Sequence, residues 1–313
     1  MIPNSDYKFY KEEFNHRYTR RDKNHDYYAP FIYHVILKKD RDCGPFGMVK
    51  GDPRIGWGTK GCAYVARSPI GKTIARELSN LQEAFPAVKI YQYCIMPDHV
   101  HILLRILERS DYHLGDYINR LKGAITRQYS QTVFKPEFTD KPLYHNHSLN
   151  GLYVYIRDNP RRLAMRIRYP QFFQRVRSIN IAGRECEAYG NFFLLRNPDK
   201  DAVKISRHYN SETLATHTKR WLYGAATGTI LVSPFISPTE RAIRDEAIAL
   251  GGHFIFITHE AFPERFKPRA SDFDLCACGR LLIISLRYRP GTPLSRAICM
   301  EMNALAASIA AAY

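Results

Sequence analysis

Hydrophobic and polar positions follow two different patterns along the chain, and the change of pattern predicts two domains. In the first part, some segments have apolar residues at helical spacing, and others are runs of β-branched and aromatic residues typical of strands. The helical spacing predicts helices over residues 70–84, 113–131 and about 149–168, and the apolar runs predict strands over residues 31–37, 88–96 and 99–107. Because Pro160 lacks a backbone N–H, we expect the third helix to be kinked or broken at Asn159-Pro160.

The first part also contains a polar terminal segment and a glycine-rich stretch. Residues 1–28 are rich in Tyr, Lys, Arg and Asp, and we expect them to form a partly ordered arm. Residues 43–61 contain six glycines and are predicted to form a loop or a hairpin. Helices packed against a small antiparallel sheet would make an α+β domain over residues 29–180.

The second part has the pattern of a buried parallel sheet. Three short, fully apolar runs occur at residues 229–232, 254–257 and 281–286, as expected for parallel strands that are covered on both faces. Between the first two lies a helix pattern that opens with a capping box, Ser237 to Glu240, and closes at Gly251-Gly252. We therefore expect a smaller α/β domain of the Rossmann-like kind over residues 181–313.

Charge narrows the class of partner. The 313 residues carry a net charge of +16 with a pI near 9.5, and 45% of them are hydrophobic, so a folded protein with a polyanionic partner is indicated. Seven arginines and one acid, Asp158, lie between Tyr153 and Ser178, with aromatic residues among them. This mixture favours nucleic acid over the alternative, a basic soluble protein without such a partner.

The cysteines and the apolar runs indicate a soluble cytoplasmic protein that does not enter a membrane. The seven cysteines are odd in number and include no C-x-x-C motif, so we expect free thiols. Cys276 and Cys278 alone are a weak zinc signal. Residues 1–14 lack the apolar core of a secretion signal, and no apolar run has the length of a membrane span.

The clearest candidate for chemistry is the pair His99-Val-His101. On a strand, residues i and i+2 point to the same face, so both imidazoles can bind one divalent metal and leave positions open for phosphate oxygens. The alternative is a pair that meets on a sheet by accident. A second pair, His145 and His147, lies in a polar stretch and ranks below the first.

The second candidate is Tyr155 with Asn159, which are i and i+4 on the predicted helix and therefore share a face. The amide oxygen of Asn159 would be a third metal ligand, and the Tyr155 phenol would attack a metal-bound phosphate to give a covalent phosphotyrosine. The alternative is a buried helix tyrosine followed by an asparagine that caps a helix before proline.

Together, Met96-Pro-Asp-His-Val-His-Ile-Leu-Leu104 and Tyr155-Ile-Arg-Asp-Asn-Pro-Arg-Arg162 resemble the His-hydrophobic-His single-tyrosine transposases. They are most similar to the transposases associated with repetitive extragenic palindromes (REP), over residues 30–170. The resemblance implies a ferredoxin-like fold, Mg²⁺ or Mn²⁺, and single-stranded or hairpin DNA as substrate. Asp98 departs from the family, where Asn is usual, and the glycine-rich stretch resembles an insertion. Tyr153 and Tyr129 remain alternatives to Tyr155.

These features predict an enzyme that nicks and rejoins DNA through a 5′-phosphotyrosine. The alternatives are a DNA-hairpin-binding protein that does not cut, and a nuclease that uses metal-bound water. A homodimer is left open. The C-terminal half resembles the Rossmann-like domain of DNA-processing protein A, which suggests a structural or DNA-holding role. Because the sequence has no clear dinucleotide fingerprint, no cofactor is predicted there. The cations expected to hold phosphates are Arg120, Lys122, Arg127, Arg161, Arg162, Arg166 and Arg168.

Overall fold

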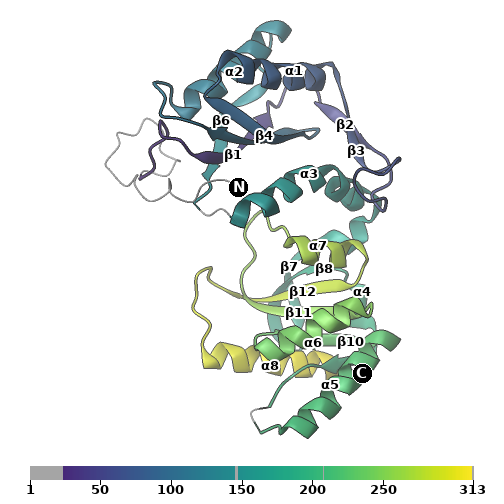
Figure 1. The fold of residues 1–313 in the computed structure, drawn as a ribbon. Coiled ribbons are helices and arrows are strands. Elements are labelled where there is room, and N and C mark those ends of the chain that lie inside the picture. Colours follow the sequence, from purple (N-terminus) through teal and green to yellow (C-terminus); the bar gives the residue numbers. More distant parts are fainter. Residues whose placement is uncertain (1–23, 145–146, 207, 312–313) are drawn as a thin grey trace. The chain divides into compact units, whose positions relative to one another are not determined.

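The computed structural model describes residues 24–311, apart from 145–146 and 207, and divides the chain into two compact units (Figure 1). The units comprise residues 1–164 and 165–313. The boundary therefore lies earlier than the one predicted after residue 180. The reason is that β7 (Gln174–Ile181) pairs with β8 (Arg184–Gly190), so both strands belong to the sheet of the second unit.

The first unit contains a four-stranded antiparallel sheet with the order β4-β5-β1-β6. Its strands are β1 (Ile32–Lys39), β4 (Val88–Ile95), β5 (His99–Ile106) and β6 (Phe134–Pro142). Helix α1 (Pro69–Ala84) connects β1 to β4, and α2 (Leu114–Tyr129) connects β5 to β6. This βαββαβ order with β5 and β1 in the centre is the ferredoxin-like arrangement, and the expected α+β fold is confirmed.

The two faces of this sheet are covered by different helices (Figure 1). On one face, Val100, Ile102 and Leu104 pack in a core that includes buried residues of α1 and α2. On the other face, Leu103 packs with Ile156 of α3 (His147–Arg168). Because side chains alternate along a strand, residues 99 and 101 of β5 share the face of Leu103, which is the face that α3 covers.

Two segments of the first unit add to the sequence predictions. Of the loop or hairpin predicted for the glycine-rich stretch, the hairpin is present: β2 (Gly47–Lys50) pairs with β3 (Tyr64–Arg67), which lies beyond the predicted range. Residues 1–23 of the predicted arm lie outside the described residues. Residues 25–27 belong to the fold, because His25 and Tyr27 are buried and Asp26 forms an ion pair with Arg109 at 2.7 Å.

Helix α3 continues through Pro160, so of the kink or break expected at Asn159-Pro160, the break does not occur. A proline removes the N–H that would bond to the carbonyl four residues earlier, here that of Ile156. The side-chain amide of Asn159 donates to this carbonyl at 3.5 Å and to the carbonyl of Tyr155 at 2.9 Å. The side chain thus supplies a donor where the backbone has none, and the helix persists.

The second unit is built on a six-stranded sheet with the order β7-β8-β12-β11-β10-β9. Four neighbouring strands are parallel: β9 (Lys200–Ala202), β10 (Ile230–Ser233), β11 (His253–Glu260) and β12 (Leu281–Tyr288). β8 joins β12 in antiparallel direction. The three predicted strands are confirmed, whereas the short strand β9 and the hairpin β7–β8 were not predicted.

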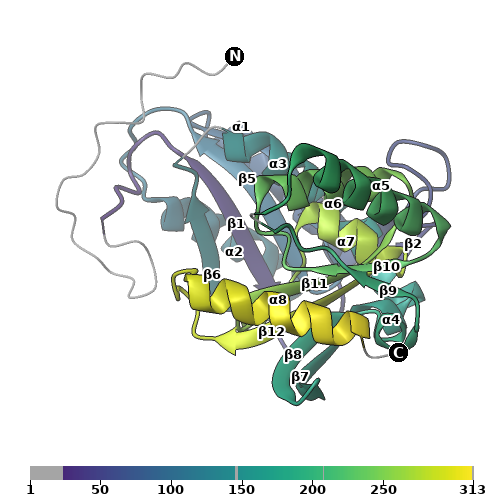
Figure 2. The ribbon, with the colours of Figure 1, turned by 90° about the horizontal axis from the view of Figure 1, so that it is seen from below.

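Helices cover both faces of this sheet, as the apolar strands require (Figure 2). Helix α8 packs on one face, and buried residues of α5, α6 and α7 pack on the other. The bounds are α4 (Phe193–Arg196), α5 (Ser211–Thr227), α6 (Pro238–Ala249), α7 (Ala270–Ala277) and α8 (Arg296–Ala311), with a 3₁₀ turn at Pro170–Phe173. The capping box between Ser237 and Glu240 is present. Within the described ranges, no helix combines the length and the apolar character needed to span a membrane.

Candidate active site

His99 and His101 emerge together from β5, as the strand pattern predicts. Their Nε2 atoms lie 3.0 Å apart. Hydrogen bonding on both sides holds the strand, since β5 pairs with β1 and with β4. His101 is buried, with 2% of its surface exposed, whereas the side chain of His99 is 22% exposed. The pair therefore has one buried member and one that solvent reaches.

The other ring nitrogen of each imidazole is held by a neighbouring side chain. Nδ1 of His99 lies 2.6 Å from Oδ1 of Asp98, and Nδ1 of His101 lies 2.9 Å from Nε2 of His34 on β1. Such contacts orient a metal-binding imidazole and select its tautomer. Asp98, which departs from the family pattern, thus has a defined partner here. His34 was not selected from the sequence, because only the β1–β5 register brings it to His101.

The paired Nε2 atoms fit a divalent ion. Two ligand atoms about 2.1 Å from an octahedral ion, at right angles to each other, are about 3.0 Å apart. Across the described part of the chain, no group of three or more His, Cys, Asp and Glu side chains could hold a metal ion. Cys94 on β4 is the pairing partner of His101 on β5. Burial raises the pKa of the Cys94 thiol to about 12, which disfavours a thiolate ligand.

Helix α3 presents a stripe of three side chains, Tyr155, Asn159 and Arg162, at the helical spacing i, i+4 and i+7. The Tyr155 ring meets the His101 ring edge to face, with centroids 5.8 Å apart. The guanidinium carbon of Arg162 lies 5.5 Å from the centroid of the Tyr155 ring, and Arg162 is only 4% exposed. A phenol, an imidazole pair and a buried cation thus come together on one face of the sheet.

Asn159 is buried beside these groups, with its amide nitrogen donating to carbonyls of the helix. The sequence left two interpretations of Asn159, a metal ligand and a structural residue before proline. The two are compatible, because the amide nitrogen supports the helix at Pro160 while Oδ1 is the atom suited to bind a cation. Asn159 therefore has the right chemistry for the third ligand, and its assignment remains a prediction.

The alternative tyrosines differ from Tyr155 in their surroundings. The Tyr129 hydroxyl lies 3.0 Å from Oγ1 of Thr73, and its ring packs against the core on the α1–α2 side of the sheet. Tyr153 is exposed and lies two residues from Tyr155, so it points to another side of α3. His145 of the second histidine pair lies outside the described residues, as does the side chain of His147. Tyr155 is thus the candidate tyrosine that contacts the imidazole pair.

Comparison with known proteins finds a transposase pattern around the histidine pair. A family model for IS200-like transposases matches residues 55–153. This stretch therefore carries the sequence pattern of the IS200-like transposases. The transposase resemblance inferred from the sequence is confirmed, and the matched stretch contains the histidine motif. The match includes His99 and His101 but ends two residues before Tyr155, so the candidate nucleophile is supported by its position in the fold.

Solved structures give weaker similarities to this chain. A REP-associated tyrosine transposase bound to a REP hairpin is 12% identical, with a TM-score of 0.33 over 45% of this chain and 72% of that chain. A protein of Deinococcus radiodurans R1 that has been proposed to be a transposase is 16% identical, with a TM-score of 0.25 over 44% of this chain and 97% of that chain. No curated protein matches the chain.

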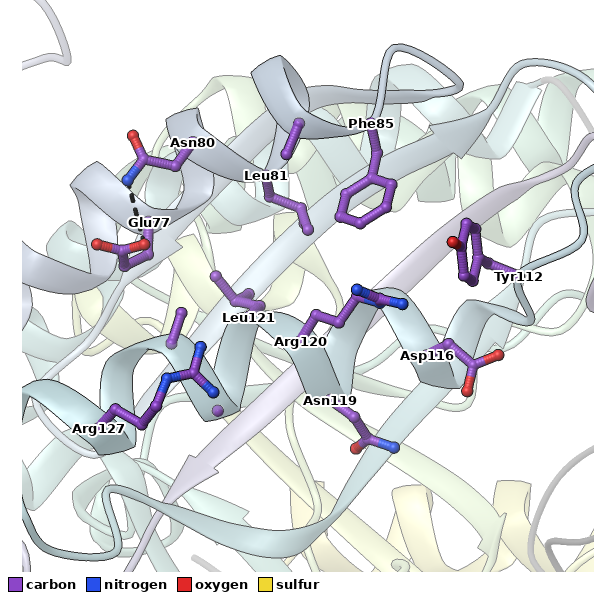
Figure 3. A pocket seen from close by; sticks show the side chains of 13 residues that line it. Glu77, Asn80, Leu81, Phe85, Tyr112, Asp116, Asn119, Arg120, Leu121 and Arg127 are labelled. Atoms are coloured by element: carbon purple, nitrogen blue, oxygen red, sulfur yellow. Dashed lines mark hydrogen bonds between the residues drawn. The ribbon is translucent and has the colours of Figure 1, made fainter.

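Three of the predicted phosphate-binding cations lie on α2, on the sheet face opposite the imidazole pair. Arg120 and Arg127 line an open groove of about 820 Å³ between α1 and α2 (Figure 3). The Arg120 guanidinium lies there over the rings of Phe85 and Tyr112. Lys122 donates to the carbonyls of Lys135 and Pro136, and burial lowers the pKa of its ammonium. The structure does not bring these cations to the active-site face, because α2 packs its apolar side against Val100 and Ile102.

The predicted arginines of α3 and its end divide between the two units. Arg161 forms an ion pair with Asp158 at 2.6 Å on the surface of α3. Arg166 and Arg168 belong to the second unit, where they lie over the rings of Phe273 and Tyr169. Within the described residues, Arg162 is the predicted cation that lies against Tyr155. The role of all the predicted phosphate-binding cations in DNA binding remains a prediction.

Proposed function

We propose that this chain nicks and rejoins single-stranded DNA through a covalent 5′-phosphotyrosine on Tyr155. The proposal rests on one observation, the edge-to-face contact of Tyr155 with the buried member of a histidine pair whose Nε2 atoms are 3.0 Å apart. The transposase pattern of residues 55–153 supports an enzyme that acts on DNA. The net charge of +16 suits a polyanionic substrate in the cytoplasm.

His99 and His101 would hold Mg²⁺ or Mn²⁺ through Nε2, with Oδ1 of Asn159 as a third ligand. When bound, the ion would polarise the phosphate oxygens of the substrate. Asp98 and His34 orient the imidazoles through Nδ1. Arg162 adds a positive charge beside the phenol, where the negative charge of the attacked phosphate would accumulate.

The residues of the chain support a reversible transfer. The Tyr155 oxygen forms a bond to phosphorus while the bond from phosphorus to the 3′ oxygen breaks. The phenol loses its proton, and the released 3′ oxygen takes one up. Because one phosphate ester replaces another, the 3′-hydroxyl can attack the phosphotyrosine and restore the strand. The contact with His101 keeps the phenol near the reacting phosphate, which lowers the entropic cost of attack.

The test is the formation of a covalent adduct. Hairpin DNA with a single-stranded flank and a label at its 3′ end is incubated with the protein and Mn²⁺, then separated on a denaturing gel. We expect a labelled protein band that is lost in Tyr155→Phe, because the phenol oxygen is the attacking atom. Tyr153→Phe and Tyr129→Phe are the matched controls and should retain the band.

Other outcomes would contradict the proposal in recognisable ways. Cleavage without an adduct would indicate a nuclease that uses water, and binding without cleavage would indicate a hairpin-binding protein. An adduct that persists in Tyr155→Phe would move the nucleophile to another residue. We expect His99→Ala to abolish the adduct while DNA affinity changes less than about threefold, because phosphate contacts dominate affinity.

A further inference from the structure

The β2–β3 hairpin lies beside both chemical motifs of the first unit. At its base, the backbone N–H of Phe46 donates to the carbonyl of Pro97 at 2.9 Å, two residues before His99. In its connecting loop, the ring of Trp57 lies 4.3 Å from the guanidinium carbon of Arg157, which is on α3 two residues after Tyr155 and therefore on another side of the helix. The glycine-rich segment, which the family resemblance marks as an insertion, thus contacts one residue near each motif of the proposed active site.

The loop between β2 and β3 is held by its own hydrogen bonds. The backbone N–H of Asp52 donates to the carbonyl of Gly61 at 2.9 Å, and that of Cys62 donates to Thr59 at 3.0 Å. Gly51 has a φ of +88°, and a Cβ atom there would lie 2.3 Å from the Cys62 oxygen. Only glycine fits this position, so the close approach of residues 51 and 62 at the start of the loop depends on Gly51.

Trp57 is presented to solvent with one face already covered. Arg157 stacks on the indole, yet 64% of the Trp57 surface remains exposed. The cation–π contact limits the motion of the ring and leaves its other face open. A large aromatic surface that is oriented and exposed in this way is suited to stack on another flat ring.

The strands of the hairpin carry a second exposed aromatic ring and a cation. Tyr64 lies directly opposite Lys50 in the β2–β3 pairing, so the two side chains share a face. Tyr64 is 52% exposed. The hairpin carries one acid, Asp52, which is already paired with Arg54. Its exposed cations are Lys50, Arg54, Lys60 and Arg67.

We propose that the β2–β3 hairpin is a nucleobase-stacking arm that binds single-stranded DNA next to α3, the helix that carries Tyr155. Trp57 stacks one base on its open face, Tyr64 offers a second ring, and the hairpin cations contact phosphates. Exposed aromatic rings among cations are the combination that binds unpaired strands, and paired bases do not offer their faces in this way. The link between this arm and the reaction at Tyr155 rests on the proposed function, whereas the binding itself can be tested independently.

Tryptophan fluorescence can report base stacking on Trp57. The chain has two tryptophans, and Trp221 is buried in the core of the second unit. We expect an oligothymidylate to quench the tryptophan emission of Tyr155→Phe, a background in which the proposed attack is blocked. Quenching should persist when Trp221→Phe is added and disappear when Trp57→Phe is added. A blunt duplex of the same length should quench much less.

Affinity measured by anisotropy of a labelled oligothymidylate tests the stacking directly. We expect Trp57→Ala to weaken binding about tenfold and Trp57→Phe less than about threefold, because phenylalanine keeps a ring to stack. The plot of log affinity against log salt should keep its slope in Trp57→Ala, whereas Lys50→Ala should reduce the slope by about 0.7. Tyr223→Ala, which removes an exposed aromatic from the second unit, is the matched control and should bind like the parent.

Failure of the arm and failure of the covalent chemistry give different results. Quenching by the single strand with the expected losses in Trp57→Ala supports the arm, even if no covalent adduct forms and the proposed function fails. Unchanged emission, or unchanged affinity in Trp57→Ala, overturns the arm, even if Tyr155 forms the adduct. Equal quenching by duplex and single strand also overturns it, because base stacking requires unpaired bases.

Discussion

At the scale of single residues, the chemistry of the imidazole pair depends on the side chains that hold the second nitrogen of each ring. Asp98 holds His99, and His34 holds His101. With Nδ1 occupied in both rings, the two Nε2 atoms face each other at 3.0 Å. Asp98 is therefore a positioning residue for the imidazole that would bind the proposed metal. Replacing its carboxylate tests this role.

We expect Asp98→Asn to weaken Mn²⁺ binding about tenfold, because loss of a carboxylate behind a metal-binding imidazole costs affinity of this order. Binding can be followed by the loss of the free Mn²⁺ signal in electron paramagnetic resonance. The control is Asp111→Asn, an exposed acid in the loop before α2, which should bind Mn²⁺ normally. Unchanged affinity in Asp98→Asn would show that the Asp98–His99 contact does not orient the ligand.

At the scale of elements, α3 combines a structural demand with a chemical one at the same residue. Pro160 leaves the carbonyl of Ile156 without a backbone donor, and the amide nitrogen of Asn159 takes its place. The amide oxygen is proposed to bind the metal. Replacing Asn159 alone would therefore affect both helix stability and metal binding. Replacing Pro160 as well restores the backbone N–H and separates the two effects.

A double-mutant cycle tests this separation. Asn159→Ala should lower the free energy of unfolding by about 1 kcal/mol, because helix carbonyls lose a donor. Pro160→Ala should raise it by about 1–3 kcal/mol by returning the N–H to the helix. In the Pro160→Ala background, Asn159→Ala should cost less stability but still weaken Mn²⁺ binding. Urea unfolding and Mn²⁺ titration measure the two effects. Full Mn²⁺ affinity in the double variant would remove Asn159 from the ligand set.

At the scale of the whole molecule, the two units have separate hydrophobic cores. Ile102 is buried in the core of the first unit, and Ile284 in that of the second, each with 0% exposure. The histidine pair and Tyr155 all lie in the first unit. We therefore expect the metal site to depend on the first core alone.

Ile284→Ala should destabilise the second unit by about 3 kcal/mol through the cavity it leaves. Differential scanning calorimetry should show one transition shifted to lower temperature, while Mn²⁺ affinity at 25 °C stays within about twofold of the wild type. The matched change in the first unit, Ile102→Ala, should shift the other transition. A single shared transition that moves with either variant would contradict the independence of the two cores.

The sequence by itself determined those features that depend on the local geometry of the backbone. The strand period placed His99 and His101 on one face, and the helix period placed Tyr155 and Asn159 on another. The apolar runs of the second unit identified its central parallel strands, and the glycines of residues 43–61 indicated a loop or a hairpin, of which the structure has the hairpin. These features can be read from the spacing of residues along the chain, because helices and strands repeat their side-chain directions at regular intervals.

Only the tertiary structure decided which of these local features meet. The register of β1 on β5 brings His34 to His101, and the packing of α3 on the sheet brings Tyr155 and Arg162 together. The same packing leaves Arg120 with α1 on the opposite face. Strand register and the choice of sheet face depend on contacts between residues far apart in the chain, and no local period records them.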